Sequence, residues 1–200
     1  ATTIAEYFKD QGYDVLLMMD SLTRYAMAQR EIGLAIGEPP IARGYTPSIY
    51  AEFPKLLERS GNFGKGSITG VYTVLVEGDD TNEPISDTVR GILDGHIVLS
   101  RQLANENHFP AIDIGASISR LMVEIVSKDH QRDASRLRNL LGLYQKNADL
   151  ISIGAYKRGS NTALDEAVSK INEINGFLQQ EIDESFSYEE TLQLIEKIVS

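Results

Sequence analysis

An aspartate and an arginine stand one helical turn apart at Asp20 and Arg24, directly after the apolar run of residues 15–19. Five consecutive apolar residues are typical of a parallel strand that is buried on both faces. An acid at the end of such a strand lies where open α/β sheets bind ligands, and its carboxylate can hold Mg²⁺ through water. The same spacing also fits a simple N-cap at Asp20 and a surface ion pair with Arg24, so the residues alone leave both interpretations open.

Another cation, Arg120, follows a segment of small residues at 115–119. It could anchor a carboxylate within the fold, or reach the phosphates held by a neighbouring subunit as an arginine finger. Spacing alone does not separate these alternatives. The three histidines, at 96, 108 and 130, are scattered along the chain and lack the spacing of a metal site, so we expect them at packing or surface positions.

The stretch from Gly61 to Ser67 places a lysine among glycines but does not match a phosphate-binding loop. Such a loop needs the pattern G-x-x-x-x-G-K-[ST] between a strand and a helix. Here Arg59 occupies the first glycine position, and Gly66 follows the lysine. We therefore expect a turn at residues 61–67 and no phosphate-binding loop in these 200 residues.

The pattern of apolar residues divides the chain near residue 124. Before it, short apolar runs alternate with helical segments and glycine turns, as in a parallel sheet covered by helices. Strands are expected at 14–20, 68–76, 96–99 and 111–114. After it, the spacing becomes helical, with helices expected at 132–148 and over an apolar stripe from Leu164 to Leu178.

Two helix starts in the second part carry capping signals, and the segment between two of its helices is expected to be a loop. Thr162 with Asp165 is a near-match to a capping box, and Ser187 with Glu190 repeats the device. Residues 154–161 have the composition of a loop. We therefore predict an α/β domain at residues 1–124 followed by a helical domain at residues 125–200.

The composition is that of an ordinary globular chain in water. The 200 residues are 42% hydrophobic and 24% charged, and 29 acids against 19 bases give a net charge of −10, which argues against nucleic-acid binding. The absence of cysteine excludes disulfides and thiolate metal sites. No apolar run approaches the roughly 20 residues of a membrane span. We expect a cytoplasmic protein and, since the first residues read as the tail of a helix and lack an initiator Met, a piece of a longer one.

Longer motifs along nearly the whole chain resemble one family. They are D-S-L-T-R-Y-A-M-A-Q-R-E-I-G at 20–33, G-E-P-P at 37–40, A-R-G-Y-T-P-S at 42–48, F-P-K-L-L-E-R at 53–59, and the segments 66–69, 115–120 and 155–159. Together they resemble the type III secretion ATPases, with the flagellum-specific ATPases as the nearest branch and the injectisome ATPases next. Both branches are related to the subunits of rotary ATP synthases.

The resemblance implies a fold and a set of site residues. Residues 1–124 would be the C-terminal portion of a RecA-like P-loop NTPase domain, from the Walker B strand to the arginine finger, and residues 125–200 its helical C-terminal domain. ATP and Mg²⁺ would be the cofactors. Asp20 would organise Mg²⁺, Arg24 would line the nucleotide pocket, Tyr45 would lie at the catalytic interface, Arg120 would be the arginine finger, and Phe186 would pack on adenine.

The sequence also departs from the pattern of its relatives. The Walker A loop and the glutamate that activates water would lie upstream of Ala1, so the isolated fragment is expected to be inactive. Leu75 stands where a rotary catalytic subunit has an aromatic residue on adenine. The acidic loop that faces a central stalk in rotary enzymes is replaced by residues 156–161, which include Lys157 and Arg158.

The function implied by the resemblance is ATP hydrolysis coupled to protein export. The whole protein would form a homohexamer at the cytoplasmic face of the inner membrane, in peripheral contact with the export gate. Stalk and regulator proteins, export chaperones and export substrates would be its partners. Two alternatives remain open, a rotary ATP synthase subunit and a non-catalytic module for oligomerisation and docking. The segment 43–48 and the basic loop speak against the first.

Overall fold

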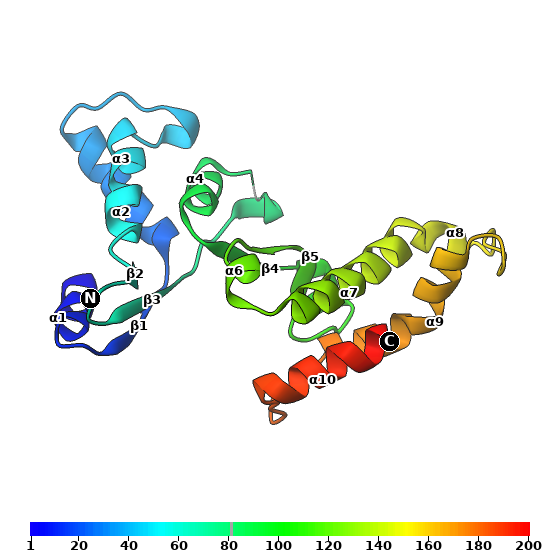
Figure 1. Ribbon diagram of the computed structural model, residues 1–200. Coiled ribbons are helices and arrows are strands. Elements are labelled where there is room, and N and C mark those ends of the chain that lie inside the picture. The colour runs from blue at the N-terminus through cyan, green and yellow to red at the C-terminus, as the bar shows by residue number, and fades with distance from the viewer. Residues whose placement is uncertain (81) are drawn as a thin grey trace. The chain divides into compact units, whose positions relative to one another are not determined.

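The computed structural model of the chain describes residues 1–80 and 82–200, and Figure 1 shows their helices and strands. They form two compact units, Ala1–Asp94 and Gly95–Ser200. Within the described residues, none of the helices has both the length and the apolar character that crossing a membrane requires.

The first unit, coloured blue to green in Figure 1, contains a small sheet and a layer of helices. Its elements in chain order are α1 (Thr2–Asp10), β1 (Asp14–Met19), α2 (Leu22–Ala35), the 3₁₀ turn η1 (Ala42–Gly44), α3 (Pro47–Leu57), β2 (Gly61–Asn62), β3 (Ser67–Tyr72), the 3₁₀ turn η2 (Glu77–Asp79) and α4 (Pro84–Ile92).

The sheet of the first unit has the order β1-β3-β2, with a parallel pair at its centre. In that pair Asp14 lies opposite Ser67, and the register continues to Met19 opposite Tyr72. Parallel neighbours need a crossover connection, which α2 and α3 supply. The predicted first two strands are thus confirmed, although the second ends at Tyr72 rather than at residue 76. The predicted turn at 61–67 contains the short strand β2, which pairs antiparallel with the start of β3.

The prediction that β1 is buried on both faces is wrong for this chain. Leu17 is buried against Ala5 and Ile68, whereas Leu16 and Met18 are 63% and 71% exposed. Successive strand residues point to opposite faces, and β1 is an edge strand whose second face no described helix covers.

A second layer of the first unit is built from α2, α3 and α4. Its core consists of Leu22, Ala26, Tyr45, Ile49, Phe53, Leu57, Ile85 and Val89. Helix α2 approaches the start of α3 closely at Gly33, where an added Cβ would collide with the Thr46 side chain. Glycine at this position therefore permits the packing of the two helices.

The second unit, coloured green to red in Figure 1, joins a strand pair to a set of helices. Its elements are β4 (Gly95–Leu99), α5 (Arg101–Asn105), β5 (Ile112–Ser119), α6 (Met122–Ile125), α7 (Lys128–Lys146), α8 (Ala148–Ser152), α9 (Thr162–Leu178) and α10 (Tyr188–Val199).

The third and fourth predicted strands exist, but they do not extend a parallel sheet. Strands β4 and β5 pair antiparallel in a sheet of their own. The reason lies in the connection between them, because the Ser100 amide donates to the Ala111 carbonyl at 2.8 Å. The chain thus enters β5 at the end where it left β4, which gives an antiparallel pair. Strand β5 also extends beyond residue 114 to Ser119.

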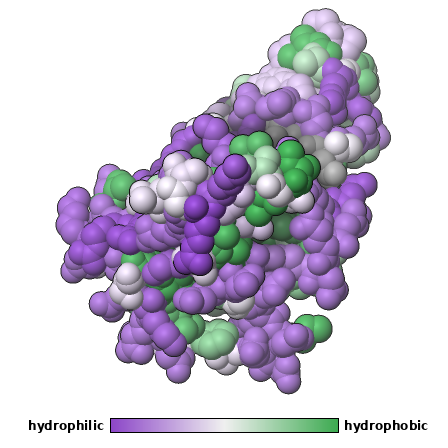
Figure 2. Space-filling model, turned by 90° about the vertical axis from the view of Figure 1, so that its right-hand side faces the viewer, coloured by the Kyte–Doolittle hydropathy of each residue, from purple (hydrophilic) through white to green (hydrophobic). Residues whose placement is uncertain are grey.

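The helical part of the second unit has a core between α7, α9 and α10. It is formed by Leu137, Leu140, Leu141, Ala167, Ile171, Ile174, Ile195, Ile198 and Val199. The predicted apolar stripe of α9 faces this core. Helix α7 begins at Lys128, four residues before the predicted start, because Ser127 caps it by accepting from the His130 amide. On the face drawn in Figure 2, the surface is mainly hydrophilic, and hydrophobic side chains gather in small groups.

The two capping predictions have different outcomes. The Ser187–Glu190 capping box at the start of α10 is confirmed. Thr162 does not cap α9, because Asn161 is the N-cap and accepts from the amides of Ala163 and Leu164. The predicted domain boundary between residues 124 and 125 stays a prediction.

Replacing Phe53 by alanine is expected to lower the free energy of unfolding by about 3–5 kcal/mol, because this fully buried ring fills the core of the first unit. Phe63→Ala is the matched control. Its ring is 40% exposed and contacts only a lysine cation among the aromatic and cation contacts of the described residues, so we expect a loss of about 1 kcal/mol or less. Urea denaturation of the chain measures both, and equal losses would contradict the assigned core.

Candidate functional site

Asp20 lies immediately after β1, where the strand meets α2. Its Oδ1 accepts a 2.7 Å hydrogen bond from the hydroxyl of Thr73, which follows β3. The backbone joins the same two ends, because the Thr73 amide donates to Met19 and the Thr73 carbonyl accepts from the Leu22 amide at 2.9 Å. The carboxylate is therefore held at the C-terminal edge of the parallel pair.

A second link joins α2 to the segment after β3. The Thr23 hydroxyl donates to the Leu75 carbonyl at 3.1 Å and accepts from the Leu75 amide at 2.9 Å. The Leu75 side chain is 54% exposed. One threonine thus satisfies both backbone groups of Leu75, so this residue has a fixed backbone and an outward side chain.

Arg24 lies in the first turn of α2, whose N-terminus is capped by the buried Ser21. The Ser21 hydroxyl accepts from the Arg24 amide at 3.3 Å. The Arg24 side chain is exposed, and among the described residues it forms no ion pair with Asp20 or any other acid. The surface ion pair allowed by the spacing is therefore not formed, and Ser21 rather than Asp20 is the N-cap.

The donor set at Asp20 fits one particular kind of magnesium binding. No cluster of three or more His, Cys, Asp or Glu side chains that could hold a metal occurs within residues 1–80 and 82–200. A cage made only of protein ligands is thus not present in the described part of the chain. A single carboxylate with one oxygen fixed by Thr73 suits Mg²⁺, which keeps several waters and takes other oxygens from phosphates.

Tyr45 is almost fully buried, 4% exposed, with its ring in the core between α2, α3 and α4. The guanidinium of Arg30 lies 5.6 Å from the ring centroid. Burial and then the negative charge of Glu83 raise the pKa of the Tyr45 hydroxyl above its ordinary value. The described surroundings therefore favour a neutral phenol.

A polar cavity of about 530 Å³ adjoins Tyr45 in the first unit. It is lined by Arg30, Arg43, Tyr45, Glu77, Gly78 and Glu83. Arg43 has a left-handed backbone, with φ 51°, and donates to Asp80 at 2.6 Å. Glu83 is buried and lies 4.0 Å from the same guanidinium.

Arg120 is the first residue after β5, and its side chain is exposed. Strand β4 packs closely against the last residues of β5, just before Arg120. A Cβ on Gly95 would lie 2.5 Å from the Ile118 carbonyl, so glycine is required opposite Ser119. Arg120 thus leaves the sheet from a tightly packed strand end.

Phe186 lies in the connection between α9 and α10, with 51% of its surface exposed. A capping box begins at the next residue and fixes the backbone that follows Phe186. In this box the Ser187 amide donates to the Glu190 carboxylate at 2.7 Å, and the Glu190 amide donates to the Ser187 hydroxyl at 3.1 Å. The hydrogen bonds that the Glu190 carboxylate accepts from Ser187, first from its backbone amide, lower the pKa of the Glu190 carboxyl. Tyr188 adds a link to α7, where its hydroxyl lies 3.2 Å from His130 Nδ1.

The loop of residues 155–161 is organised by Asp165 of α9. The Asp165 carboxylate accepts hydrogen bonds from the Tyr156 hydroxyl and from the Gly159 amide, the latter at 2.9 Å to Oδ2. The hydrogen bond between the Tyr156 hydroxyl and Asp165 raises the pKa of Tyr156. Lys157 and Arg158 are exposed at the tip of the loop.

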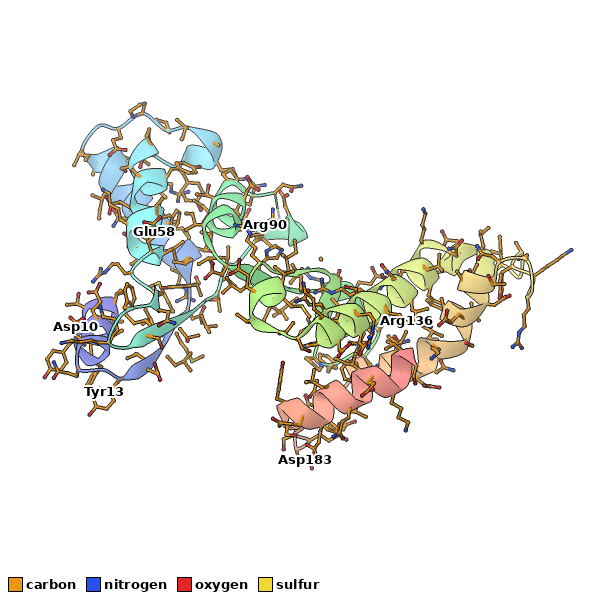
Figure 3. The ribbon with its side chains drawn as sticks, viewed as in Figure 1. Asp10, Tyr13, Glu58, Arg90, Arg136 and Asp183 are labelled. Atoms are coloured by element: carbon orange, nitrogen blue, oxygen red, sulfur yellow. The ribbon has the colours of Figure 1, made fainter. Side chains whose placement is uncertain are left out.

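A second cavity of about 270 Å³ lies beside α7 and α9. Arg136, labelled in Figure 3, pairs with Glu166 at 2.6 Å on its wall, and Leu140 and Leu143 also line it. None of the sequence-predicted site residues lines this cavity.

The predicted site residues thus fall in both units. Asp20 and Arg24 share the junction of β1 and α2, and Tyr45 lies in the adjoining core. Arg120 and Phe186 belong to the second unit. Sequence reasoning missed Thr73 and Thr23, the two hydroxyls that fix this edge of the sheet. Thr73 lies inside the strand predicted at residues 68–76, so no sequence signal distinguished it, and nothing local marked Thr23.

Comparison with known proteins gives the class and then the family. Residues 126–197 match the T3SS EscN ATPase C-terminal domain, and residues 1–119 match the nucleotide-binding domain of the ATP synthase alpha/beta family. The fold is therefore a nucleotide-binding α/β domain joined to a helical C-terminal domain, as predicted. The chain belongs to the ATP synthase alpha/beta family.

Similar proteins come from flagellar and secretion systems alike. The chain is 58% identical over 192 residues to the flagellum-specific ATP synthase of Bacillus subtilis, covering 96% of the chain and 44% of that protein. It is 54% identical over 197 residues to the type 3 secretion system ATPase of Xanthomonas euvesicatoria, covering 98% and 45%. The chain thus spans less than half the length of these relatives.

Two solved structures are also similar to this chain. The assembled ATPase EscN of enteropathogenic E. coli matches with a TM-score of 0.97 and 53% identity, over 100% of this chain and 48% of that one. The ATP synthase subunit NeqB of Nanoarchaeum equitans matches with a TM-score of 0.89 at 31% identity, over 100% and 50%.

Tyr45 is expected to ionise at a higher pH in the folded chain than a free tyrosine does, because burial and Glu83 favour its neutral form and raise its pKa. The stabilisation from its raised pKa is complete below the unfolded value of about 10 and is lost as the pH rises through the folded pKa. Absorbance titration of the chain and of Tyr45→Phe isolates this residue as a difference. A difference that titrates at the pH of a free tyrosine amide would contradict the burial argument.

Proposed function

We propose that this chain is part of an ATPase that hydrolyses ATP in a homohexameric ring and drives protein export by a type III secretion system, most closely the flagellar one. One observation carries the proposal, the likeness of the entire chain to assembled EscN at 53% identity. The flagellar relative at 58% identity supports the flagellar branch. Residues of the whole protein outside this chain would supply the Walker A loop and the glutamate that activates water.

Asp20 would organise the hydration shell of Mg²⁺ at the edge of the β1–β3 pair. Its hydrogen bond from Thr73 supports this role, because it fixes one oxygen and leaves the other for a metal-bound water. When bound, Mg²⁺ would neutralise developing charge on the phosphates. Arg24, exposed one turn into α2 and without an ion pair in the described residues, would line the same pocket.

Arg120 would act on ATP held by the adjacent subunit. Charge builds on the γ-phosphoryl oxygens during transfer, and a guanidinium from a neighbour stabilises that charge. Hydrolysis would then depend on ring formation. The exposure of Arg120 at the end of β5 supports this role.

Phe186 and Tyr45 would serve nucleotide binding in different ways. Phe186, half exposed beside a capped helix start, would offer its ring to adenine. Tyr45 is buried, so it would support the catalytic interface from within the core, where it lies under Arg30. Leu75, with its fixed backbone, would give an aliphatic contact where rotary enzymes use an aromatic one.

The partners would be those of an export apparatus. A central stalk is the first, and the complex of EscN with its stalk EscO supports it. Regulator proteins, export chaperones, export substrates and the membrane export gate would follow, at the cytoplasmic face of the inner membrane. The matches over residues 1–119 and 126–197 support a domain boundary near residues 124 and 125.

A rotary ATP synthase subunit is the less favoured candidate. NeqB is similar in fold, but at 31% identity it is well below the 50–58% of several secretion and flagellar relatives. A docking module without catalysis describes the isolated chain rather than the whole protein.

The finger role is tested in a hybrid in which this chain replaces the matching 192 residues of the Bacillus subtilis relative. Arg120→Ala is expected to lower the ring's kcat by about 10³-fold to 10⁵-fold while leaving nucleotide affinity nearly unchanged. Arg132→Ala is the matched control, since this exposed arginine pairs within the described part of the chain only with Asp129 and Asp133. Unchanged hydrolysis by the assembled Arg120→Ala ring would refute the finger.

The isolated chain is expected to bind ATP weakly or not at all, because Asp20 and Arg24 lack a phosphate-binding loop beside them. Calorimetric titration of ATP with and without Mg²⁺ measures this directly. Tight, Mg²⁺-dependent binding by the 200 residues would show that the pocket is complete without further chain.

A further inference from the structure

Strand β5 contains a large irregularity three residues before Arg120. His96 of β4 pairs with Ile118, and Val98 pairs with Asp113, so the single residue Ile97 faces residues 114–117 of β5. Bulges of this kind bend a strand and redirect the side chains that follow it, and they are frequent beside active sites. Everything between Asp113 and Ile118 must therefore be held by something other than the strand ladder.

Ser117 supplies the missing bonds. Its hydroxyl donates to the Asp113 carbonyl at 2.6 Å and accepts from the Val98 amide at 2.9 Å. The residue is only 8% exposed. One side chain thus closes the bulge on itself and fastens it to β4, in a place where water has little access to replace it.

Three further contacts complete the lock. The Asp113 carboxylate accepts from the Ala116 amide at 3.0 Å, and His96 Nε2 donates to the Ala116 carbonyl at 3.1 Å. Arg138 of α7 donates to the Ser117 carbonyl at 3.5 Å. The bulge is therefore anchored to β4 and to α7.

We propose that Ser117, assisted by Asp113, is a positioning residue that sets the direction of Arg120. It touches no substrate and acts through the backbone of β5. The inference rests on the proposed function of Arg120 as the finger. A finger must meet its phosphate closely, and a displacement of about 1 Å can reduce a rate by about 10²-fold.

The test uses the hybrid ring described above. Ser117→Ala removes both hydroxyl bonds and is expected to lower kcat by about 10-fold to 100-fold, with KM for ATP and hexamer formation unchanged. Ser117→Thr keeps the hydroxyl and should restore most of the rate. Ser169→Ala is the matched control, since that hydroxyl also donates to a carbonyl, Glu166, but lies on α9 away from β5.

A double-mutant cycle separates positioning from a general structural role. In the Arg120→Ala background, Ser117→Ala should change kcat by less than about 2-fold, because the group it aims is already gone. An equal loss in both backgrounds would overturn the proposal, as would an unchanged kcat in the Ser117→Ala ring. If Arg120→Ala alone has no effect, the finger itself is refuted and the positioning role falls with it.

Asp113→Ala provides a second route if Ser117→Ala does not fold. It removes the hydrogen bond that the Asp113 carboxylate accepts from the Ala116 amide, at a side chain that is partly exposed. A smaller loss of kcat that again vanishes without Arg120 supports the proposal. A folded Asp113→Ala ring with full activity would contradict the proposal that hydrogen bonds within the bulge position Arg120.

Discussion

The parallel pairing of β1 with β3 is the constraint on which the first unit depends. It brings the ends of two strands that are 53 residues apart to the same edge, where Thr73 meets Asp20. The bonds between Thr23 and Leu75 extend the alignment beyond the last ladder position. The hydroxyls of Thr73 and Thr23 thus fix the C-terminal edge of the sheet and hold the start of α2 against it.

The second unit solves the same problem without a parallel pair. Its strands β4 and β5 run antiparallel, and the strand that leads to Arg120 is interrupted by the bulge at residues 114–117. In the bulge, the buried Ser117 hydroxyl makes hydrogen bonds to the backbone in place of those that a paired strand makes in the first unit. A threonine hydroxyl thus fixes the Asp20 carboxylate directly, whereas the Ser117 hydroxyl fixes the backbone just before Arg120 through the Val98 amide and the Asp113 carbonyl.

Local patterns predicted the elements well, whereas contacts between distant residues decided what the patterns could not. The apolar run before Asp20 predicted a strand, and helical spacing predicted α9, because each depends on neighbours within a few residues. The exposure of Leu16 and Met18 depends on which helices cover the sheet, and no local signal reports that. Thr162 looked like a cap, but Asn161 competed for the same amides, and Asp165 turned to the loop instead. Thr73 and Ser117 act through partners chosen by the fold, so periodicity gave no sign of them.

The loop organised by Asp165 has a thermodynamic consequence. Ordering a residue costs about 1–2 kcal/mol of conformational entropy, and a loop that is free in solution meets this cost when it binds. Here the Tyr156 and Gly159 bonds to Asp165 order the loop as the chain folds. Whatever molecule touches Lys157 and Arg158 therefore meets two cations on a backbone that is already ordered, and more of the contact free energy remains available as affinity.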